Sequence, residues 1–386
     1  MLSLEKINPE IGMKIVADEK IPFLKGIIEP FADIEYYPGI QIDKDKIRDA
    51  DALLIRTRTI CNQNLLEGSN VKFIASATIG YDHIDTEYCK KKNIYWINAP
   101  GCNSGSVMQY IASALVLFAK SRNIDLKKRT LGVIGVGNVG KKVVRLAEIL
   151  GIQVVLNDPP RQRAEGPCGF ISLEGILREA DIITLHVPLI YEGEDHTYHM
   201  VNENFLGRLN RGTLLINSSR GEVIDTSALS RFLKKGFPES VILDVWENEP
   251  AIDRDLLYES FIGTPHIAGY SADGKANGTK MIVQALSRFF NLGIDDWQPD
   301  NIPVPEKKEI VYDGNNKNFQ EIITDLVLQT YDIRQDDRAL RNSINDFELL
   351  RGNYPLRREF STYHVKIENV PAEYKKQLMS LGFQLI

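Results

Sequence analysis

A series of nearly continuous apolar runs between residues 130 and 246 constrains the fold of this chain more than any other feature. The runs are TLGVIGVG at 130–137, IQVVLND at 152–158, DIITLHVP at 181–188, TLLINSS at 213–219 and SVILDVW at 240–246. Strands that are apolar at almost every position are typical of a parallel sheet covered by helices on both faces. This part of the chain is therefore predicted to form a doubly wound α/β domain.

Shorter apolar runs precede this region and predict a second parallel sheet. They are KIVAD at 14–18, DALLIR at 51–56, VKFIASAT at 71–78 and IYWINA at 94–99. Short runs that alternate with helix-compatible segments indicate βαβ units. The segment at 106–122 is too long and too rich in Ala and Leu for a strand, so we expect a buried helix between the two sheets.

The rest of the chain predicts a third, smaller part. At about 150 residues per domain, 386 residues correspond to two or three domains. A long helix is expected at 271–291, and the proline-rich run PDNIPVPEKKE at 299–309 reads as a linker. A small α/β module is expected after it, with a helix at 319–331, a strand at 361–367, and a helix and terminal strand within 372–386.

A glycine-rich run, GVGNVG at 135–140, follows the first apolar strand of the second sheet and opens a helix. Gly135 permits the tight turn, Gly137 lets a pyrophosphate approach the backbone, and Gly140 lets the helix pack against the strand. Free N–H groups and the helix dipole favour phosphates at such an N-terminus. The cofactor-binding candidates here are Gly135, Gly137, Asn138, Val139 and Gly140.

The acidic residue at the end of the next strand strengthens this interpretation. Asp158 lies 18 residues beyond Gly140, where dinucleotide-binding folds place a carboxylate that binds the ribose 2′-hydroxyl. A carboxylate there repels a 2′-phosphate, which favours NAD. Arg161 and Arg163 follow closely and keep NADP open as an alternative.

Three segments at predicted strand ends carry polar side chains suited to chemistry. They are INSSRGEVID at 216–225, LDVWENEP at 243–250 and TPHIAGY at 264–270. Ligands of open α/β sheets bind beyond the carboxyl ends of the strands. Arg220, Glu249 and His266 are therefore the candidate catalytic residues.

Each of these three residues fits one task in hydride transfer. A guanidinium clamps a carboxylate through two parallel hydrogen bonds, which suits Arg220 to substrate binding. Histidine side chains exchange protons near neutral pH, which suits His266 to the role of acid and base. Glu249 would fix the imidazole tautomer and favour its protonated form. Each residue alone also fits a structural role, but their joint occurrence after a dinucleotide fingerprint favours an active site.

These segments resemble the D-isomer-specific 2-hydroxyacid dehydrogenases, in which the matching Arg, Glu and His bind the carboxylate, assist the base and act as acid and base. The resemblance rests on GVGNVG, NSSRG, LDVWENEP and TPHIAGY. It extends to APGCN at 99–103, NDPP at 157–160, YDIRQDDRALR at 331–341 and YPLRREFSTY at 354–363, and it covers nearly everything from Met13 onward. General members of the family lack the C-terminal module.

The resemblance implies a specific activity and further site residues. Members with this C-terminal module oxidise 4-phospho-D-erythronate to 2-oxo-3-hydroxy-4-phosphobutanoate with NAD in pyridoxal 5′-phosphate (vitamin B6) biosynthesis, as homodimers. Cofactor contacts are implied at Asp158, Val187, Ser218, Ser219, Asp244 and Gly269, and substrate contacts at Thr57, Thr78 and Tyr270. Val187 departs from the expected hydroxyl residue, so only a backbone contact is implied there.

A substrate with a carboxylate at one end and a phosphate at the other needs a second cationic patch. Arg56 and Arg58 leave a strand end of the first domain, and we expect one of them to contact the phosphate, although a solvated pair is equally consistent. The arginines at 351, 357 and 358 form a second candidate patch, which a partner subunit or simple packing would also explain.

Composition narrows the class of protein. The net charge of −6 (46 basic and 52 acidic residues) argues against nucleic acid as a partner. The longest apolar stretch is too short for a membrane span, and the N-terminus lacks the pattern of a secretory signal. Four cysteines without zinc-ligand spacing indicate no metal site and a reducing, cytoplasmic location.

We therefore expect two Rossmann-like doubly wound domains and a small C-terminal α/β module. A discontinuous substrate or lid domain is expected at 13–105 and 267–298, an NAD-binding domain at 106–266, and a C-terminal dimerisation domain at 310–386. Two alternatives stay open: a dehydrogenase for another D-2-hydroxy acid such as 3-phosphoglycerate, and a non-catalytic NAD-sensing regulator on the same fold.

Overall fold

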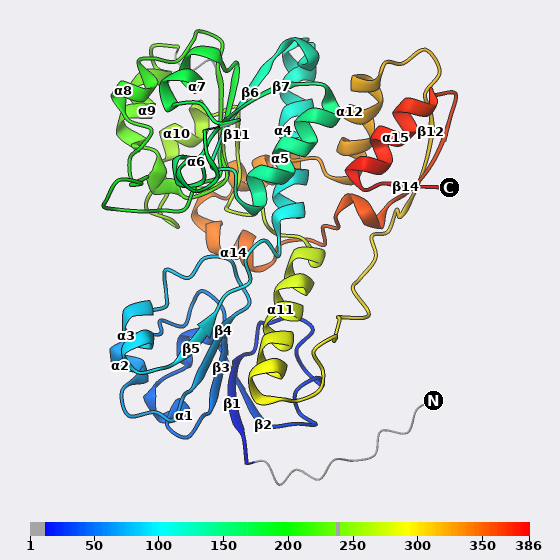
Figure 1. Ribbon diagram of the computed structural model, residues 1–386. Helices are drawn as coiled ribbons and strands as arrows, with labels where there is room; N and C mark the ends of the chain where they lie inside the picture. The colour runs from blue at the N-terminus through cyan, green and yellow to red at the C-terminus, as the bar shows by residue number, and fades with distance from the viewer. Residues whose placement is uncertain (1–11, 168, 237–239) are drawn as a thin grey trace. The chain divides into compact units, whose positions relative to one another are not determined.

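The computed structural model describes residues 12–167, 169–236 and 240–386, and the chain divides into two compact units (Figure 1). Unit 1 contains the residues up to Asn103 together with Ala272–Pro303, and unit 2 contains Ser104–Ser271 and Val304–Ile386. The chain passes between units where the helices α4 (Ser104–Arg122) and α11 (Ala272–Phe290) begin. The C-terminal module belongs to unit 2.

Unit 1 is built on a five-stranded parallel sheet with the order β2-β1-β3-β4-β5. Its strands are β1 (Lys14–Asp18), β2 (Asp33–Tyr37), β3 (Ala52–Ile55), β4 (Phe73–Ser76) and β5 (Tyr95–Ile97). Helix α11 packs its apolar side on one face of the sheet, with Ile282 and Leu286 in one core cluster. The other face is covered by α1 (Lys44–Ile47), α2 (Gln63–Leu66) and α3 (Thr86–Lys91). The prediction of a parallel α/β sheet is confirmed.

Unit 2 contains a six-stranded parallel sheet with the order β11-β10-β9-β8-β6-β7. The strands are β6 (Thr130–Ile134), β7 (Gln153–Asn157), β8 (Ile182–Leu185), β9 (Leu214–Asn217), β10 (Ser240–Leu243) and β11 (Ile262–Gly263). The order of strand addition reverses between β6 and β8, which is where ligands of such sheets bind. The doubly wound sheet predicted from the apolar runs is confirmed.

Helices cover both faces of this sheet. Helix α4 is buried along almost its whole length, as predicted, and lies with α5 (Asn138–Leu150) on one face. The other face carries α7 (Leu173–Glu179), α8 (Glu203–Leu206), α9 (Thr226–Leu233) and α10 (Arg254–Glu259). A short helix, α6 (Pro159–Glu165), follows β7. No helix among the described residues is long and apolar enough to cross a membrane.

The C-terminal module shares its core with the sheet of unit 2. Its parallel strands are β12 (Glu309–Asp313), β13 (His364–Glu368) and β14 (Gln384–Leu385), and its helices are α12 (Phe319–Thr330), α13 (Arg334–Asn342), α14 (Phe347–Gly352) and α15 (Ala372–Leu381). Buried side chains of α12 belong to the same apolar cluster as those of α4 and α5, and the three helices lie together in Figure 1.

Helix α13 bonds directly to β11 and to the segment that precedes it. Asp337 accepts a hydrogen bond from the backbone N–H of Gly263 at 2.8 Å. Arg341 pairs with Asp337 and donates to the carbonyls of Leu257 and Ser260. The C-terminal module is thus joined to the nucleotide-binding sheet by buried polar contacts as well as by its core.

Candidate active site

The glycine-rich loop forms a close strand-to-helix turn at the carboxyl end of β6. Gly135 has a φ of +87°, and a Cβ there would lie 2.5 Å from the carbonyl oxygen of His186. A Cβ at Gly140 would lie 2.2 Å from the Gly135 carbonyl oxygen, whereas a Cβ at Gly137 would meet nothing within 4 Å. Two glycines therefore serve packing, and Gly137 leaves open space at the start of α5 that fits a pyrophosphate.

Asp158 fastens this loop to the end of β7. One carboxylate oxygen accepts from the N–H of Val136 at 2.8 Å, and the other accepts from the N–H of Arg161 at 3.0 Å. Both oxygens keep a further lone pair that can accept from a ribose hydroxyl. The carboxylate is therefore at the position predicted for a dinucleotide, directly beside the glycine loop.

The two arginines that kept NADP open are held by other carboxylates. Arg161 pairs with Glu165 at 2.6 Å and donates to the Val136 carbonyl. Arg163 pairs with Asp195 and with Glu194. A 2′-phosphate would have to compete with these partners and with Asp158, so the arrangement favours NAD.

Replacing Asp158 with alanine should lower kcat/KM for NAD about 10- to 100-fold, because hydrogen bonds to a charged group contribute about 1.5–3 kcal/mol and about 1.4 kcal/mol corresponds to a factor of ten. Steady-state kinetics with NAD and NADP in parallel measure this effect. Since the carboxylate also repels a 2′-phosphate, the NAD/NADP preference should fall by more than NAD efficiency does. An equal loss with both cofactors would instead mean that Asp158 only supports the loop.

The segment after β9 contains a buried serine hydroxyl, that of Ser218, which has no hydrogen-bond partner. Ser219 is tied down, because its N–H and its hydroxyl both donate to the side-chain oxygen of Asn217. Asn217 in turn donates to the Arg220 carbonyl. The Ser218 Oγ is buried without a hydrogen-bond partner. Buried polar groups are normally satisfied, so this orphaned hydroxyl fits a contact with a bound cofactor.

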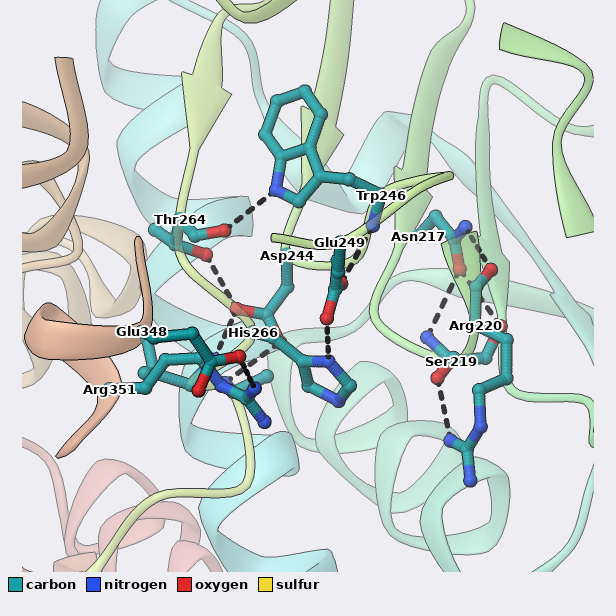
Figure 2. Close-up of polar contacts among 12 residues, drawn as sticks. Asn217, Ser219, Arg220, Asp244, Trp246, Glu249, Thr264, His266, Glu348 and Arg351 are labelled. Carbon is teal, nitrogen blue, oxygen red and sulfur yellow. Dashed lines mark hydrogen bonds and ion pairs between the residues drawn. The ribbon is translucent and has the colours of Figure 1, made fainter. Parts of the chain in front are cut away.

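His266 and Glu249 form a hydrogen-bonded pair just beyond the strand ends (Figure 2). The Nδ1 of His266 lies 2.8 Å from Oε2 of Glu249, and Oε1 of Glu249 accepts from the Trp246 N–H at 3.0 Å. Burial alone would raise the pKa of Glu249, but the hydrogen bond and charge of His266, the Trp246 N–H and the charge of Arg351 together lower it. Glu249 is therefore a carboxylate at neutral pH and accepts from Nδ1, which leaves Nε2 of the neutral imidazole able to take a proton.

The loop that carries His266 has an uncommon backbone conformation. His266 has a φ of +55°, which is uncommon for a residue other than glycine and is a conformation also found at active sites. Asp244, only 1% exposed, holds this loop by accepting from the Thr264 hydroxyl and from the N–H groups of Ile267 and Ala268. Burial raises the pKa of Asp244. The structure thus shows a loop-holding role for Asp244, and its contact with NAD stays a prediction.

Arg357 of the C-terminal module holds the same loop from its other side. It is 5% exposed and donates to the carbonyls of Ala268 and Ile267, and also to that of Ser106 in α4. Its guanidinium lies 4.3 Å from the centre of the Tyr331 ring. The sequence predicted Arg357 as part of a second candidate cationic patch, but its two terminal nitrogens donate inside the protein, and only its Nε lacks a hydrogen-bond partner.

Arg220 follows Ser218 and Ser219 in the segment after β9 and is half-buried, with one guanidinium nitrogen donating to the Ser219 carbonyl at 2.9 Å. In Figure 2 its guanidinium and the ring of His266 lie on the same side of the strand ends. Val187 follows β8, and its side chain would lie 3.0 Å from a Cβ at Gly135. Gly269 and Tyr270 continue the His266 loop.

The remaining predicted substrate residues belong to unit 1. Arg56 and Thr57 follow β3, and Thr78 follows the neighbouring parallel strand β4, so the three lie at one edge of that sheet. The Thr78 hydroxyl lies 2.7 Å from that of Ser76. Among the described residues no group of His, Cys, Asp and Glu is arranged to hold a metal ion. Cys61, Cys89 and Cys102 are buried and form no disulfide within the described part of the chain, and Cys168 lies outside the described residues.

Comparisons with known proteins find NAD-dependent 2-hydroxyacid dehydrogenases among the similar families and solved structures. Residues 116–268 match the family described as D-isomer specific 2-hydroxyacid dehydrogenase, NAD binding domain, and residues 302–382 match a domain of unknown function (DUF3410). Among solved structures, NAD- and lactate-bound D-lactate dehydrogenase from Aquifex aeolicus is 27% identical, with a TM-score of 0.61 over 73% of this chain and 96% of that one. NAD-bound 3-phosphoglycerate dehydrogenase from Entamoeba histolytica is 26% identical, with a TM-score of 0.61 over 75% of this chain and 99% of that one.

Curated relatives cover nearly the whole chain. An erythronate-4-phosphate dehydrogenase of Bacteroides fragilis is 49% identical over 92% of this chain and 99% of its own length. An erythronate-4-phosphate dehydrogenase of Cronobacter sakazakii is 39% identical over 96% of this chain and 98% of its own length. These relatives, together with the NAD-binding fold and the polar residues at its strand ends, show that the chain belongs to the erythronate-4-phosphate dehydrogenase family of NAD-dependent D-2-hydroxyacid dehydrogenases.

Proposed function

We propose that this protein oxidises 4-phospho-D-erythronate to 2-oxo-3-hydroxy-4-phosphobutanoate with NAD, a step of pyridoxal 5′-phosphate (vitamin B6) biosynthesis. The observation that carries the chemistry is the His266–Glu249 pair, with its 2.8 Å hydrogen bond, in the same unit as a dinucleotide-binding loop. The names of the nearly full-length relatives support the choice of substrate.

The residues divide the work of the reaction among them. NAD, when bound at the glycine loop, Asp158 and Ser218, supplies the acceptor for the hydride that leaves C2. Arg220 binds the substrate carboxylate and so fixes C2 beside the imidazole. Nε2 of His266 takes the proton of the C2 hydroxyl as the C2–H bond breaks, and the carboxylate of Glu249 stabilises the imidazolium that forms. The protein thus provides one anion clamp and one base held in a single tautomer.

A substrate panel tests this function. The purified protein should oxidise 4-phospho-D-erythronate with NAD at least 100-fold more efficiently than 3-phosphoglycerate or D-lactate, measured as kcat/KM from the appearance of NADH. A preference for 3-phosphoglycerate would assign the protein to another 2-hydroxy acid. Binding of NAD without turnover of any member of the panel would favour the NAD-sensing alternative, which the intact His266–Glu249 pair argues against.

We also infer that the protein works as a homodimer, in which the C-terminal module supports pairing. The resemblance to the family supports this state. Light scattering on the purified protein should give twice the 43.6 kDa mass of one chain, and the mass of a single chain would contradict it.

A further inference from the structure

We propose that Arg351, in the C-terminal module, binds the phosphate of the substrate, so that this module of unassigned function completes the active site of its own chain. The proposal rests on the function proposed above and adds to it the residue that selects a phosphorylated substrate. Arg351 lies in α14, which belongs to the same compact unit as His266.

The fold holds the Arg351 guanidinium close to the catalytic pair. It lies 5.8 Å from the ring centre of Tyr270, four residues after His266, and 5.9 Å from that of Phe347. The positive charge of Arg351 contributes to lowering the pKa of Glu249, and the negative charge of Glu249 contributes to raising the pKa of Arg351. In Figure 2 the side chains of Arg351 and Arg220 are drawn on opposite sides of the His266 ring. A cation from the C-terminal module therefore faces the same reaction centre as Arg220.

The hydrogen bonds of Arg351 leave room for a ligand. Its NH1 nitrogen pairs with Glu348 at 3.2 Å, but its Nε is buried without a hydrogen-bond partner. A guanidinium presents five N–H donors in a planar fork that matches phosphate oxygens, and Nε with one terminal nitrogen forms one side of that fork. Because buried donors are normally satisfied, the orphaned Nε points to an acceptor that binds from outside the protein.

Arg357, another arginine of the C-terminal module, forms hydrogen bonds to backbone carbonyls instead. The Nε of Arg357 also lacks a partner, but both terminal nitrogens donate to the carbonyls of Ile267, Ala268 and Ser106, so Arg357 holds the catalytic loop and has no free pair of donors for a phosphate. Arg351 forms an ion pair with Glu348, whose side chain is 40% exposed. A phosphate that binds Arg351 would compete with this partly solvated carboxylate. Replacing Glu348 therefore offers a second test of the proposal.

The chemistry of the substrate matches two arginines beside one base. The carboxylate of 4-phospho-D-erythronate is attached to the carbon that is oxidised, and the phosphate is two carbons further along. With Arg220 on the carboxylate and His266 at the C2 hydroxyl, the phosphate needs a separate cation near the imidazole. Bidentate arginine contacts suit a phosphate dianion better than a point charge does.

The decisive experiment compares Arg351→Gln with Arg338→Gln, an exposed arginine of the same module, on 4-phospho-D-erythronate and on unphosphorylated D-erythronate. Arg351→Gln should raise KM for the phosphorylated substrate about 10- to 100-fold, as expected for loss of a charge-assisted pair. Its kcat should stay within about threefold, and kcat/KM for D-erythronate should fall by no more than about threefold, which allows for the effect of the Arg351 charge on Glu249. Arg338→Gln should behave as the wild type. Glu348→Gln, which removes the competing carboxylate, should lower KM for the phosphorylated substrate.

Other outcomes overturn the inference and can be told apart from failure of the proposed function. An unchanged KM in Arg351→Gln would exclude the phosphate contact, and a KM rise in Arg56→Gln or Arg58→Gln instead would move it to unit 1. Equal losses on both substrates would mean that Arg351 acts through the His266–Glu249 pair.

If the wild type does not oxidise 4-phospho-D-erythronate, the proposed function is wrong. Calorimetric titration of the NAD complex with inorganic phosphate then tests the phosphate site separately, because the wild type should bind phosphate and Arg351→Gln should not. If Arg351→Gln does not fold, Arg351→Lys should show a smaller rise in KM.

Discussion

Replacing His266 with alanine should lower kcat about 1,000-fold or more while leaving the affinity for NAD within a factor of two. A positioned acid-base group contributes about 10²–10⁴-fold to a reaction of this kind. The imidazole is hydrogen-bonded to Glu249, whereas the glycine loop and Asp158 lie at the carboxyl ends of other strands. Stopped-flow measurement of NADH formation gives kcat, and fluorescence titration with NADH gives the affinity.

The exposed His196 offers a matched control, because its replacement by alanine removes the same ring from the same unit. His196→Ala should keep wild-type kcat and cofactor affinity. Turnover by His266→Ala within tenfold of the wild type would remove His266 from the role of base. A parallel loss of NADH binding would show that the substitution had disturbed the loop rather than the proton transfer.

Replacing Arg357 with methionine should lower the free energy of unfolding of unit 2 by about 3 kcal/mol or more. Removing one partner from a buried charged network costs about 3–5 kcal/mol, because the remaining polar groups lose their partner without regaining water. Those groups are the carbonyls of Ile267, Ala268 and Ser106, together with Asp336, whose pKa burial raises despite the nearby Arg357 charge. Since the carbonyls of Ile267 and Ala268 directly follow His266, kcat should fall as well.

Urea denaturation followed by circular dichroism measures this loss of stability. Arg338→Met is the control, because Arg338 is an exposed arginine of the same module, and it should shift the unfolding free energy by less than about 0.5 kcal/mol. Equal stability of the two variants would mean that the Arg357 contacts contribute nothing net. A stable Arg357→Met enzyme with reduced kcat would restrict Arg357 to positioning the loop.

Much of the fold was predictable because both sheets are buried on two faces. In β6 and β3, for example, burial forces apolar residues at consecutive positions, and those runs were recognised. Strand β2 escaped prediction because it lies at the edge of its sheet, where only half-burial is needed and the sequence DIEYY suffices. Helix α13 escaped it because its sequence RQDDRALRN is almost entirely polar, and helix α14 because it has only six residues.

In the site, too, the residue types could be predicted from local sequence patterns, whereas the contacts between them depend on the tertiary structure. Residue type and position after a strand were enough to select Arg220, Glu249 and His266, and the glycine spacing was enough to place the cofactor loop. The 2.8 Å contact between His266 and Glu249 depends on a loop that Asp244 and Arg357 hold from distant parts of the chain. Sequence alone left Arg351 and Arg357 equivalent, because only the folded structure shows that both terminal nitrogens of Arg357 donate to backbone carbonyls, whereas Arg351 pairs with Glu348.

The core shared by α12 and α4 has a consequence for how this protein can change in evolution and in the laboratory. A chain that ended before residue 304 would expose the apolar side chains of α4 that now pack against α12. It would also remove Asp337, which accepts a hydrogen bond from the Gly263 N–H, so the edge strand β11 would be open to pairing with other chains. The result would be an aggregation-prone remnant rather than a minimal dehydrogenase. Removal of the module therefore calls for compensating changes in α4, and chimeras with relatives that lack it require that helix to be redesigned.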